Sequence, residues 1–315
     1  MKKNRFFTVT VIASVMMSVT SCHDNEIDVL SDQRTEVQFS TNIRTMDVNL
    51  RAAGNTWHPL DPIGIYMYEE NNIEVVDEME NISYVTEVGG STGNFKPVST
   101  VIYFPDNGDK VRFMSYYPYR STVSDNGDVF KVNIGDQSEQ PKIDLLYSFD
   151  IGTKYDKKSP GKKVSLIFTH QLTKIHVNVK AGEGLSDTDL QNVTTSFLGL
   201  NTKADFNLVT GVLSDLSDPQ EILLKPMTAA VDYKASFEAI VLPTADFSGV
   251  QMTLDLKNGD IGEGIASDKF VWSLNRELAP STKYTFNVIV NRSGIVVEAT
   301  INDWTNADAD DIIAE

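Results

Sequence analysis

The chain of 315 residues contains one cysteine, Cys22, and no long uninterrupted apolar run. A single cysteine cannot form an intramolecular disulfide, so the fold depends on packing and hydrogen bonds. The longest mostly apolar stretch, residues 6–19, is about 14 residues long, whereas a spanning helix needs about 20. These two absences exclude a disulfide scaffold and argue against a transmembrane helix.

Basic residues are scarce. The chain has 27 Lys and Arg against 44 Asp and Glu, and its net charge is −17. Such an acidic protein is repelled by phosphate backbones and by anionic lipid headgroups. The composition therefore predicts no nucleic-acid partner and no electrostatic docking to membranes.

The usual motifs of catalysis are also missing. The sequence has no glycine-rich phosphate loop and no GxSxG motif. His170 and His176 lie six residues apart without a nearby third ligand, and the acidic residues 308–311 lack the glycine and closing glutamate of a calcium loop. We therefore predict that the protein is not an enzyme and has no metal or cofactor.

The N-terminus has the pattern of a lipoprotein signal. Lys2, Lys3 and Arg5 precede the apolar stretch, and two small residues follow it just before Cys22. This arrangement predicts a signal peptide over residues 1–21 and lipidation of Cys22 as the first residue of the mature chain. The polar residues 22–35 are then an acidic tether, and we expect an outer-membrane lipoprotein exposed at the cell surface.

The rest of the chain favours an all-β fold. Val37, Phe39, Thr41 and Ile43 alternate with polar residues, as in a strand with one buried face. The only helix candidate is the short segment that begins with Ser186 and resembles a capping box. Further strands are predicted at residues 63–68, 101–105, 111–119, 129–134, 144–148, 164–170, 174–179, 193–200, 211–213, 235–242, 250–256, 269–272, 283–290 and 295–301.

Turn signals divide these strands. Asn107-Gly108 predicts a hairpin between residues 101–105 and 111–119, and residues 69–83 and 89–94 are predicted to be loops. Many short strands separated by turns are typical of β-sandwiches. The charged, Pro- and Gly-containing residues 157–163 predict a boundary between domains at 36–160 and 161–315.

The segment containing Tyr116, Tyr117 and Tyr119 is rich in aromatic residues. Exposed rings there would form a platform for sugar rings, so these three residues are candidate glycan contacts. Partly buried strand tyrosines are the simpler interpretation.

The sequence resembles the Mfa-like fimbrillins, the pilin and pilin-like lipoproteins of type V pili. The resemblance extends almost from end to end. It is carried by the signal ending at Cys22 and by residues 37–40, 51–57, 63–66, 111–119, 144–147, 166–175, 201–207 and 301–304.

This resemblance implies two tandem transthyretin-like β-sandwich domains and a structural or adhesive role in fimbriae. It also implies that a trypsin-like or Arg-specific protease removes the first strand, and that a strand from another fimbrial subunit fills the groove by donor-strand exchange. The expected partners are other subunits, the protease, the outer membrane through the Cys22 lipid, and a host or microbial surface ligand.

The cleavage residue should be an exposed arginine after the first strand. Arg51, in a loop of small residues, is the first choice, and Arg44, at the end of the strand, is the alternative. Each is otherwise an ordinary surface arginine.

The C-terminus is less typical of a strand donor, because only Ile312 and Ile313 are bulky after Trp304. Either residues 295–301 leave their own sheet to act as the donor, or the subunit does not donate. A non-donating subunit would be a tip or anchor protein. The alternative function is a lipid-anchored glycan-binding surface protein that does not polymerise.

Overall fold

The structure is a computed structural model that describes residues 34–44, 56–124, 128–149, 152–158, 163–256, 269–274 and 276–303. All of them belong to the compact unit Arg34–Glu315. The described elements are β-strands, apart from the two short 3₁₀-helices η1 (Gln140–Lys142) and η2 (Asp187–Leu190). None of the described residues forms a helix long and apolar enough to cross a membrane. The prediction of an all-β fold is confirmed.

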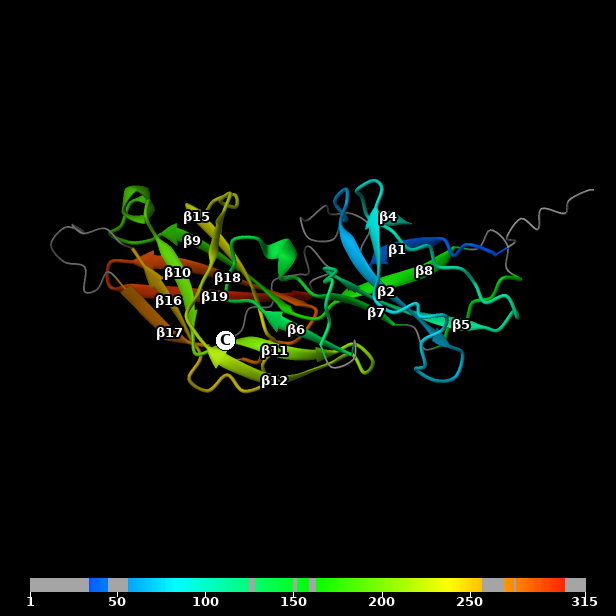
Figure 1. Ribbon diagram of the computed structural model, residues 1–315. Helices are drawn as coiled ribbons and strands as arrows, with labels where there is room; N and C mark the ends of the chain where they lie inside the picture. The colour runs from blue at the N-terminus through cyan, green and yellow to red at the C-terminus, as the bar shows by residue number, and fades with distance from the viewer. Residues whose placement is uncertain are drawn as a thin grey trace, which may run out of the picture. The chain divides into compact units, whose positions relative to one another are not determined.

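Seven strands form a sheet that closes on itself. β1 lies between β4 and β8, antiparallel to β4 and parallel to β8, and so completes the ring of hydrogen bonds (Figure 1). The strands follow one another around the sheet in the order β1 (Phe39–Ile43), β4 (Thr92–Pro97), β3 (Ile82–Thr86), β2 (Pro62–Glu69), β5 (Val111–Tyr117), β7 (Leu146–Phe149) and β8 (Val164–His170).

Three further sheets contain the other strands. The first has the order β12 (Val212–Pro219), β11 (Asn201–Asn207), β6 (Val129–Asn133). The second is β13 (Ile222–Leu223), β10 (Thr194–Leu198), β16 (Gln251–Asp255), β17 (Lys269–Ser273). The third is β14 (Lys225–Met227), β15 (Ala235–Val241), β9 (Thr173–Ala181), β18 (Thr282–Asn291), β19 (Gly294–Asp303).

Two hydrophobic clusters share the strands β2 and β5. The first cluster collects side chains from all seven strands of the closed sheet, including Ile65 of β2 and Phe113 of β5. The second cluster contains the alternate residues Tyr66 and Tyr116 of the same strands, packed with side chains of the other three sheets. Because β2 and β5 are buried on both faces, their sequences are almost continuously apolar.

Two sequence predictions about residues 69–119 are wrong. The turn at Gly108 exists, since its N–H donates to Pro105 O at 3.1 Å. However, β5 pairs with β2 and β7, and Tyr103 forms only one isolated bridge, to Glu36. The segments interpreted as loops, 69–83 and 89–94, overlap the first residues of β3 and β4. β4 was missed because Gly93 interrupts the strand pattern that a sequence shows.

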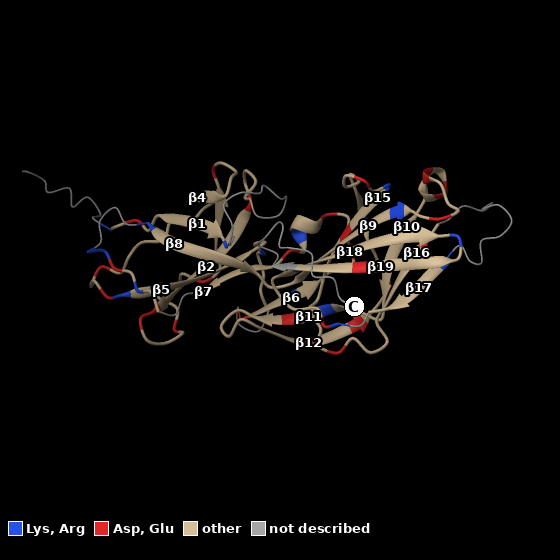
Figure 2. Ribbon diagram, turned by 180° about the vertical axis from the view of Figure 1, so that it is seen from behind, with Lys and Arg blue, Asp and Glu red and all other residues tan. Residues whose placement is uncertain are grey.

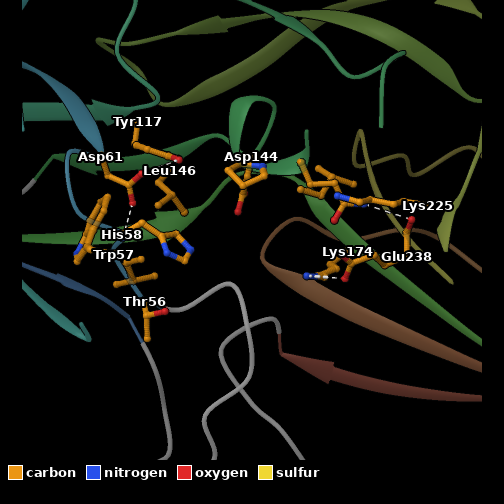
Figure 3. A pocket seen from close by; sticks show the side chains of 14 residues that line it. Thr56, Trp57, His58, Asp61, Tyr117, Asp144, Leu146, Lys174, Lys225 and Glu238 are labelled. Carbon is orange, nitrogen blue, oxygen red and sulfur yellow. Dashed lines mark hydrogen bonds and ion pairs between the residues drawn. The ribbon is translucent and has the colours of Figure 1, made fainter. Parts of the chain in front are cut away.

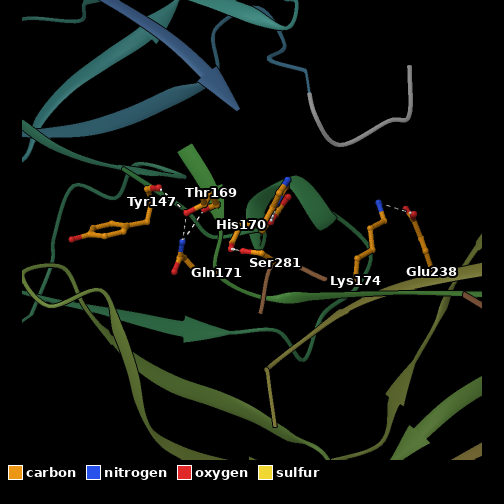
Figure 4. Close-up of polar contacts among 8 residues, drawn as sticks. Tyr147, Thr169, His170, Gln171, Lys174, Glu238 and Ser281 are labelled. Carbon is orange, nitrogen blue, oxygen red and sulfur yellow. Dashed lines mark hydrogen bonds and ion pairs between the residues drawn. The ribbon is translucent and has the colours of Figure 1, made fainter. Parts of the chain in front are cut away.

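The strands predicted at residues 164–170 and 174–179 exist, but β8 and β9 belong to different sheets. The turn between them is fixed by polar contacts (Figure 4). Gln171 Nε2 donates to the backbone oxygen of Thr169 at 2.9 Å, and the Ser281 hydroxyl donates to His170 O. The capping box is also present at η2, where Ser186 N–H donates to Asp189 Oδ2 at 2.7 Å.

Figure 2 shows the positions of Lys and Arg scattered along the described part of the chain, with Asp and Glu frequent in the loops. The ion pairs given by the structure are mostly exposed, such as Lys131 Nζ with Asp205 Oδ2 at 2.6 Å. Exposed pairs contribute little to stability. The absence of a nucleic-acid partner stays a prediction.

Packing of the first cluster predicts a large effect of Phe168→Ala. Phe168 of β8 is fully buried, and its ring lies edge-on to Trp57 at 5.2 Å. Truncation should cost about 3–5 kcal/mol through lost burial and a residual cavity, and should lower the urea midpoint clearly. Ile167→Ala on the same strand, where the side chain is 52% exposed, should change stability by about 0.5 kcal/mol or less. Equal effects of the two variants would contradict this description of the core.

The surroundings of His176 of β9 predict that the folded protein loses stability in acid. Its Nε2 is buried and has no hydrogen-bond partner in the part of the chain that the structure describes. Burial, reinforced by the charge of Lys283, lowers the pKa of His176 from 6.5 to about 4. Above pH 6.5 the imidazole is neutral in both the folded and the unfolded chain. As the pH falls from 6.5 to 4, only the unfolded chain gains the proton, so stability falls, by about 3 kcal/mol at full extent. Below pH 4 both forms are protonated and the loss stops.

Urea titrations between pH 7 and pH 4 test this assignment. His176→Gln should remove most of the decline, because glutamine cannot be protonated. His58→Gln, at an exposed position, is the matched control and should leave the decline unchanged. If His176→Gln declines as steeply as the wild type, another group causes the acid sensitivity.

Candidate functional site

The candidate site is the groove between β4 and β8 that β1 fills. Backbone pairing runs along both edges of β1, with Phe39 opposite Phe95 of β4 and Val164 of β8. At the other end of the strand Ile43 pairs with Phe168. A strand held on both edges and buried on one face is attached by two ladders of hydrogen bonds and by its side chains.

The inward side chains of β1 and of the residue before it fill the first cluster. Val37, Phe39, Thr41 and Ile43 are all buried, as their alternation in the sequence predicts. The ring of Phe39 meets the rings of Tyr84 and Phe113 edge to face, each at 5.2 Å between centroids. Phe39 is therefore the largest anchor of the strand.

The Thr41 position is the tightest part of the groove. A Cβ added to Gly93 of β4 would lie 2.8 Å from Thr41 Oγ1, 2.7 Å from the Phe95 ring and 3.1 Å from Trp57 Cδ1. Only glycine leaves room for these side chains. Thr41 Oγ1 and Trp57 Nε1 are buried, and neither has a hydrogen-bond partner among the described residues.

The chain on either side of β1 is also attached. Val37 N–H donates to Ile102 O at 2.9 Å, and Gln38 O accepts from Val164 N–H at 2.8 Å. After the strand, Arg44 N–H donates to Phe168 O at 2.8 Å, while the Arg44 side chain is exposed. Arg51, the first-choice cleavage residue, lies outside the described residues, as does Cys22.

A pocket of about 230 Å³ lies beside the end of β1 and is lined by Ile43, Trp57 and several charged groups (Figure 3). Its carboxylates already have partners. Asp61 Oδ2 accepts from His58 N–H at 2.7 Å, Asp144 Oδ1 lies 2.9 Å from His170 Nδ1, and Glu238 Oε2 lies 3.0 Å from Lys174 Nζ. Among the carboxylates lining the pocket, none is left as an unpaired acid or base.

The Asp61 carboxyl of this pocket is partly buried. Burial raises its pKa, while the hydrogen bond from His58 N–H acts in the opposite direction. Tyr117 OH also approaches Asp61 Oδ1, at 3.5 Å. These contacts fix the chain at the start of β2 and do not form a catalytic pair.

The candidate glycan tyrosines do not share one exposed surface. Tyr116 is fully buried and its hydroxyl donates to Asn81 Oδ1 at 2.7 Å, while burial raises its pKa to about 12. Tyr117 is 7% exposed and its ring contacts Trp57 at 5.7 Å between centroids. Tyr119 is partly exposed. Sugar binding at this segment stays a prediction.

The two histidines singled out in the sequence have different surroundings. His170 of β8 is buried against Asp144, whereas His176 of β9 lies among Lys174, Lys283 and Glu238. Within the described ranges no group of three or more His, Cys, Asp or Glu could hold a metal ion. The acidic residues 308–311 lie outside those ranges.

Sequence reasoning placed Thr41 on the inward face but missed the contribution of Trp57 and Gly93 to the groove. The signal for Gly93 was weak, because it lies among other glycines and polar residues that are typical of a loop. Trp57 lies between the strands predicted from the sequence, where no buried residue was expected. Its contact with both walls of the groove, through Phe95 and Phe168 at 5.2 Å each, depends on long-range packing.

Known proteins resemble this chain over nearly its whole length. A relative from Bacteroides uniformis named "Putative fimbrium subunit Fim1C" is 31% identical over 312 residues, which is 96% of each chain. A crystal structure of a "putative cell adhesion protein" from Bacteroides uniformis is 29% identical, with a TM-score of 0.69 over 87% of this chain and 99% of that one. One from Bacteroides ovatus, at 22% identity and a TM-score of 0.68 over the same shares, has the same fold.

The sequence pattern of the family described as fimbrillin-like matches residues 51–304. This match covers most of the chain, and it agrees with the resemblance drawn from the sequence. The family consists of fimbrial structural subunits, so the prediction that the protein is not an enzyme is confirmed. The chain belongs to the fimbrillin-like family.

Proposed function

We propose that this protein is a structural or adhesive subunit of fimbriae that is exported as a lipoprotein. A protease then removes its first strand, and the subunits polymerise by donor-strand exchange. Family membership supports the fimbrial role and a place at the cell surface. The observation that carries the assembly step is the position of β1, which closes a sheet between β4 and β8 and is followed at once by Arg44.

Loss of β1 would leave unpaired backbone edges and exposed apolar side chains in the groove. The backbone of β4 and β8 would lose a pairing partner on the facing edges, and unpaired edges readily accept strands from other chains. The inward residues of the groove would lose the burial that four side chains now provide. Each fully buried side chain of this size contributes about 1.5–3 kcal/mol, so an incoming strand of similar pattern would be bound strongly.

The surroundings of Arg44 favour Arg51 as the cleavage residue. A protease binds its substrate as an extended, accessible backbone, whereas the Arg44 amide is already bonded to Phe168 O. A trypsin-like or Arg-specific protease is therefore the proposed processing partner, with Arg44 as the alternative site.

The other proposed partners follow from the same assembly. They are further fimbrial subunits, the outer membrane through a lipid on Cys22 before processing, and a host or microbial surface ligand of the finished fimbrium. The mature protein is accordingly anchored in the outer membrane first and located in the fimbrium after cleavage.

We further propose the tandem transthyretin-like β-sandwich arrangement for the two parts of the chain. Strand pairing supports a division after β8 rather than at residue 160, because β8 pairs with β1 and β7 whereas β9 pairs with β15 and β18. β6 is an exception within the first part, since it pairs with β11.

Substitution of the two arginines tests the processing step. Arg51→Ala should leave the surface protein full length, lipidated and unpolymerised, because the protease lacks its residue. Arg44→Ala is the matched control and should be processed normally to a chain that starts at Ala52. Intact mass and N-terminal sequencing of protein from the native cell surface, with a polymer ladder on gels, are the measurements.

The reverse result would be a wild-type mature chain that starts at Thr45, with processing abolished by Arg44→Ala and not by Arg51→Ala. That result would place cleavage at the alternative site, Arg44. A wild-type protein that keeps an acylated Cys22 and its first strand, and yet is assembled in fimbriae, would refute removal of the strand.

A further inference from the structure

A larger pocket lies beside the loop that follows β5. It has a volume of about 1030 Å³ and is lined mainly by residues 117–124 and 129–131. It shares Asp61, Tyr117 and Pro141 with the pocket of about 230 Å³ described above. Pockets that hold small molecules typically have volumes of about 300–1,000 Å³, so this one is large enough for a ligand of a few sugar units.

The charge of the lining differs from that of the whole chain. Acidic residues outnumber basic ones in the sequence, 44 to 27. The larger pocket is instead lined by three cations, Arg120, Lys131 and Lys142, and by one carboxylate, that of Asp61. Both lysines already form ion pairs with neighbouring carboxylates. Among the described residues no carboxylate forms an ion pair with Arg120, so this arginine is the cation that is left for a ligand.

The position of Arg120 is fixed by its neighbours. Its backbone N–H donates to the Tyr116 hydroxyl at 3.3 Å, and its carbonyl oxygen accepts from Asn81 Nδ2 at 2.9 Å. Its guanidinium carbon lies 4.5 Å from the centroid of the buried Phe130 ring. The ring attracts the cation without replacing a carboxylate as a hydrogen-bond acceptor. The guanidinium is therefore held in place and keeps the planar set of donors that fits a carboxylate.

We propose that this pocket binds a saccharide that carries one carboxylate, such as a sialic acid or a uronic acid, and that Arg120 binds the carboxylate. An arginine and a carboxylate form two parallel hydrogen bonds, which are stronger than bonds between neutral groups. The negative charge of Asp61 in the same lining disfavours a ligand with many carboxylates. This inference rests on the proposed function, since it names the chemical class of the surface ligand.

The other side chains of the lining suit a sugar. Pro118 and Tyr119 are partly exposed, so they offer apolar surface to the C–H groups of a sugar ring. Ser121 and Thr122 are exposed beside them, and a hydroxyl side chain both donates and accepts hydrogen bonds, as sugar hydroxyls do. The pocket thus combines apolar surface, neutral polar groups and one available cation.

The backbone beside the pocket favours a saccharide over an acidic peptide. Extended peptides commonly bind by pairing with an unpaired strand edge. Here Tyr119 N–H donates to Pro62 O at 2.9 Å, and Ser124 and Val129 donate to each other's carbonyl oxygens at 3.1 Å. These bonds occupy backbone groups at both ends of the loop, and the bonds of Arg120 occupy two more. Side chains are left as the main contacts for a ligand.

Titration of defined sugars into the unpolymerised protein tests this inference. The protein is the mature chain with Cys22→Ala, which carries no lipid. The probes are sialyllactose with its neutral counterpart lactose, and the hyaluronan disaccharide with its neutral counterpart chitobiose. We expect an acidic sugar to bind about tenfold more tightly than its neutral counterpart, as measured by calorimetry. If neither acidic sugar is preferred, the inference is overturned.

Substitution of Arg120 tests the residue itself. Arg120→Gln should lower the affinity for the acidic sugar about tenfold, and Arg120→Lys should recover only part of it, because an ammonium lacks the planar set of donors. Arg292→Gln, at an exposed position between β18 and β19, makes the same change in net charge and should leave the affinity unchanged. Melting curves verify that each variant is folded. Equal weakening by Arg120→Gln and Arg292→Gln would overturn the role of Arg120.

Two further probes identify other ligands. Sulfolactose that binds more tightly than both acidic sugars would make the anion a sulfate, and a tetraglutamate peptide that binds more tightly than both would make the partner an acidic peptide. Either result overturns the inference.

Fimbrial assembly is scored separately. Arg120→Gln should give a normal polymer ladder on the native cell surface, because the pocket has no part in strand exchange. A wild-type protein that polymerises and prefers no acidic sugar refutes only the sugar site. A wild-type protein that binds the acidic sugar and forms no polymer refutes only the assembly step.

Discussion

The pairing of β1 with β4 and β8 is the interaction on which the first part of this structure depends. These two ladders convert an open set of six strands into a closed sheet, and they enclose a cluster to which every strand of that sheet contributes. One of the two pairings is parallel and joins residues that lie more than a hundred positions apart in the chain. Closing so long a loop costs chain entropy, which the two ladders and the buried side chains of β1 must offset.

Two strands of the closed sheet, β2 and β5, are also held by contacts outside that sheet. β2 and β5 contribute to both clusters, and Tyr116 packs against Phe130 of β6 at 5.4 Å. β6 pairs in turn with β11. Removal of β1 leaves this second set of contacts in place, so the remaining strands keep an anchor outside the closed sheet. A binding groove that stays preformed loses less entropy when a new strand enters.

Much of the fold follows from the sequence because alternation reports burial on one face. The inward set of β1, the strands β8, β9, β15, β18 and β19, and the capping box at Ser186 are all visible as local patterns. Pairing is less visible, since β8 and β9 are adjacent in sequence and separate in space. β4 was hidden because its glycine is required by Thr41, Phe95 and Trp57, which are distant in sequence. Burial of Tyr116 and Tyr117 likewise depends on distant parts of the chain, because β5 is covered on both faces. Local sequence alone therefore could not tell whether these rings are exposed for sugar binding.

β1 combines strong attachment with a local flaw. Phe39 and its neighbours hold the strand through burial. Thr41, however, brings a hydroxyl into an apolar core beside the Trp57 indole, and neither group has a hydrogen-bond partner within the described ranges. A buried polar group without a partner costs about 1–3 kcal/mol. That cost is small compared with the burial of the other side chains, so the monomer stays closed, but it is large enough to change an equilibrium between competing strands by tenfold or more. A strand with a small apolar residue at that position would avoid the cost, so in the proposed exchange the driving free energy would be the difference between two occupants of one groove.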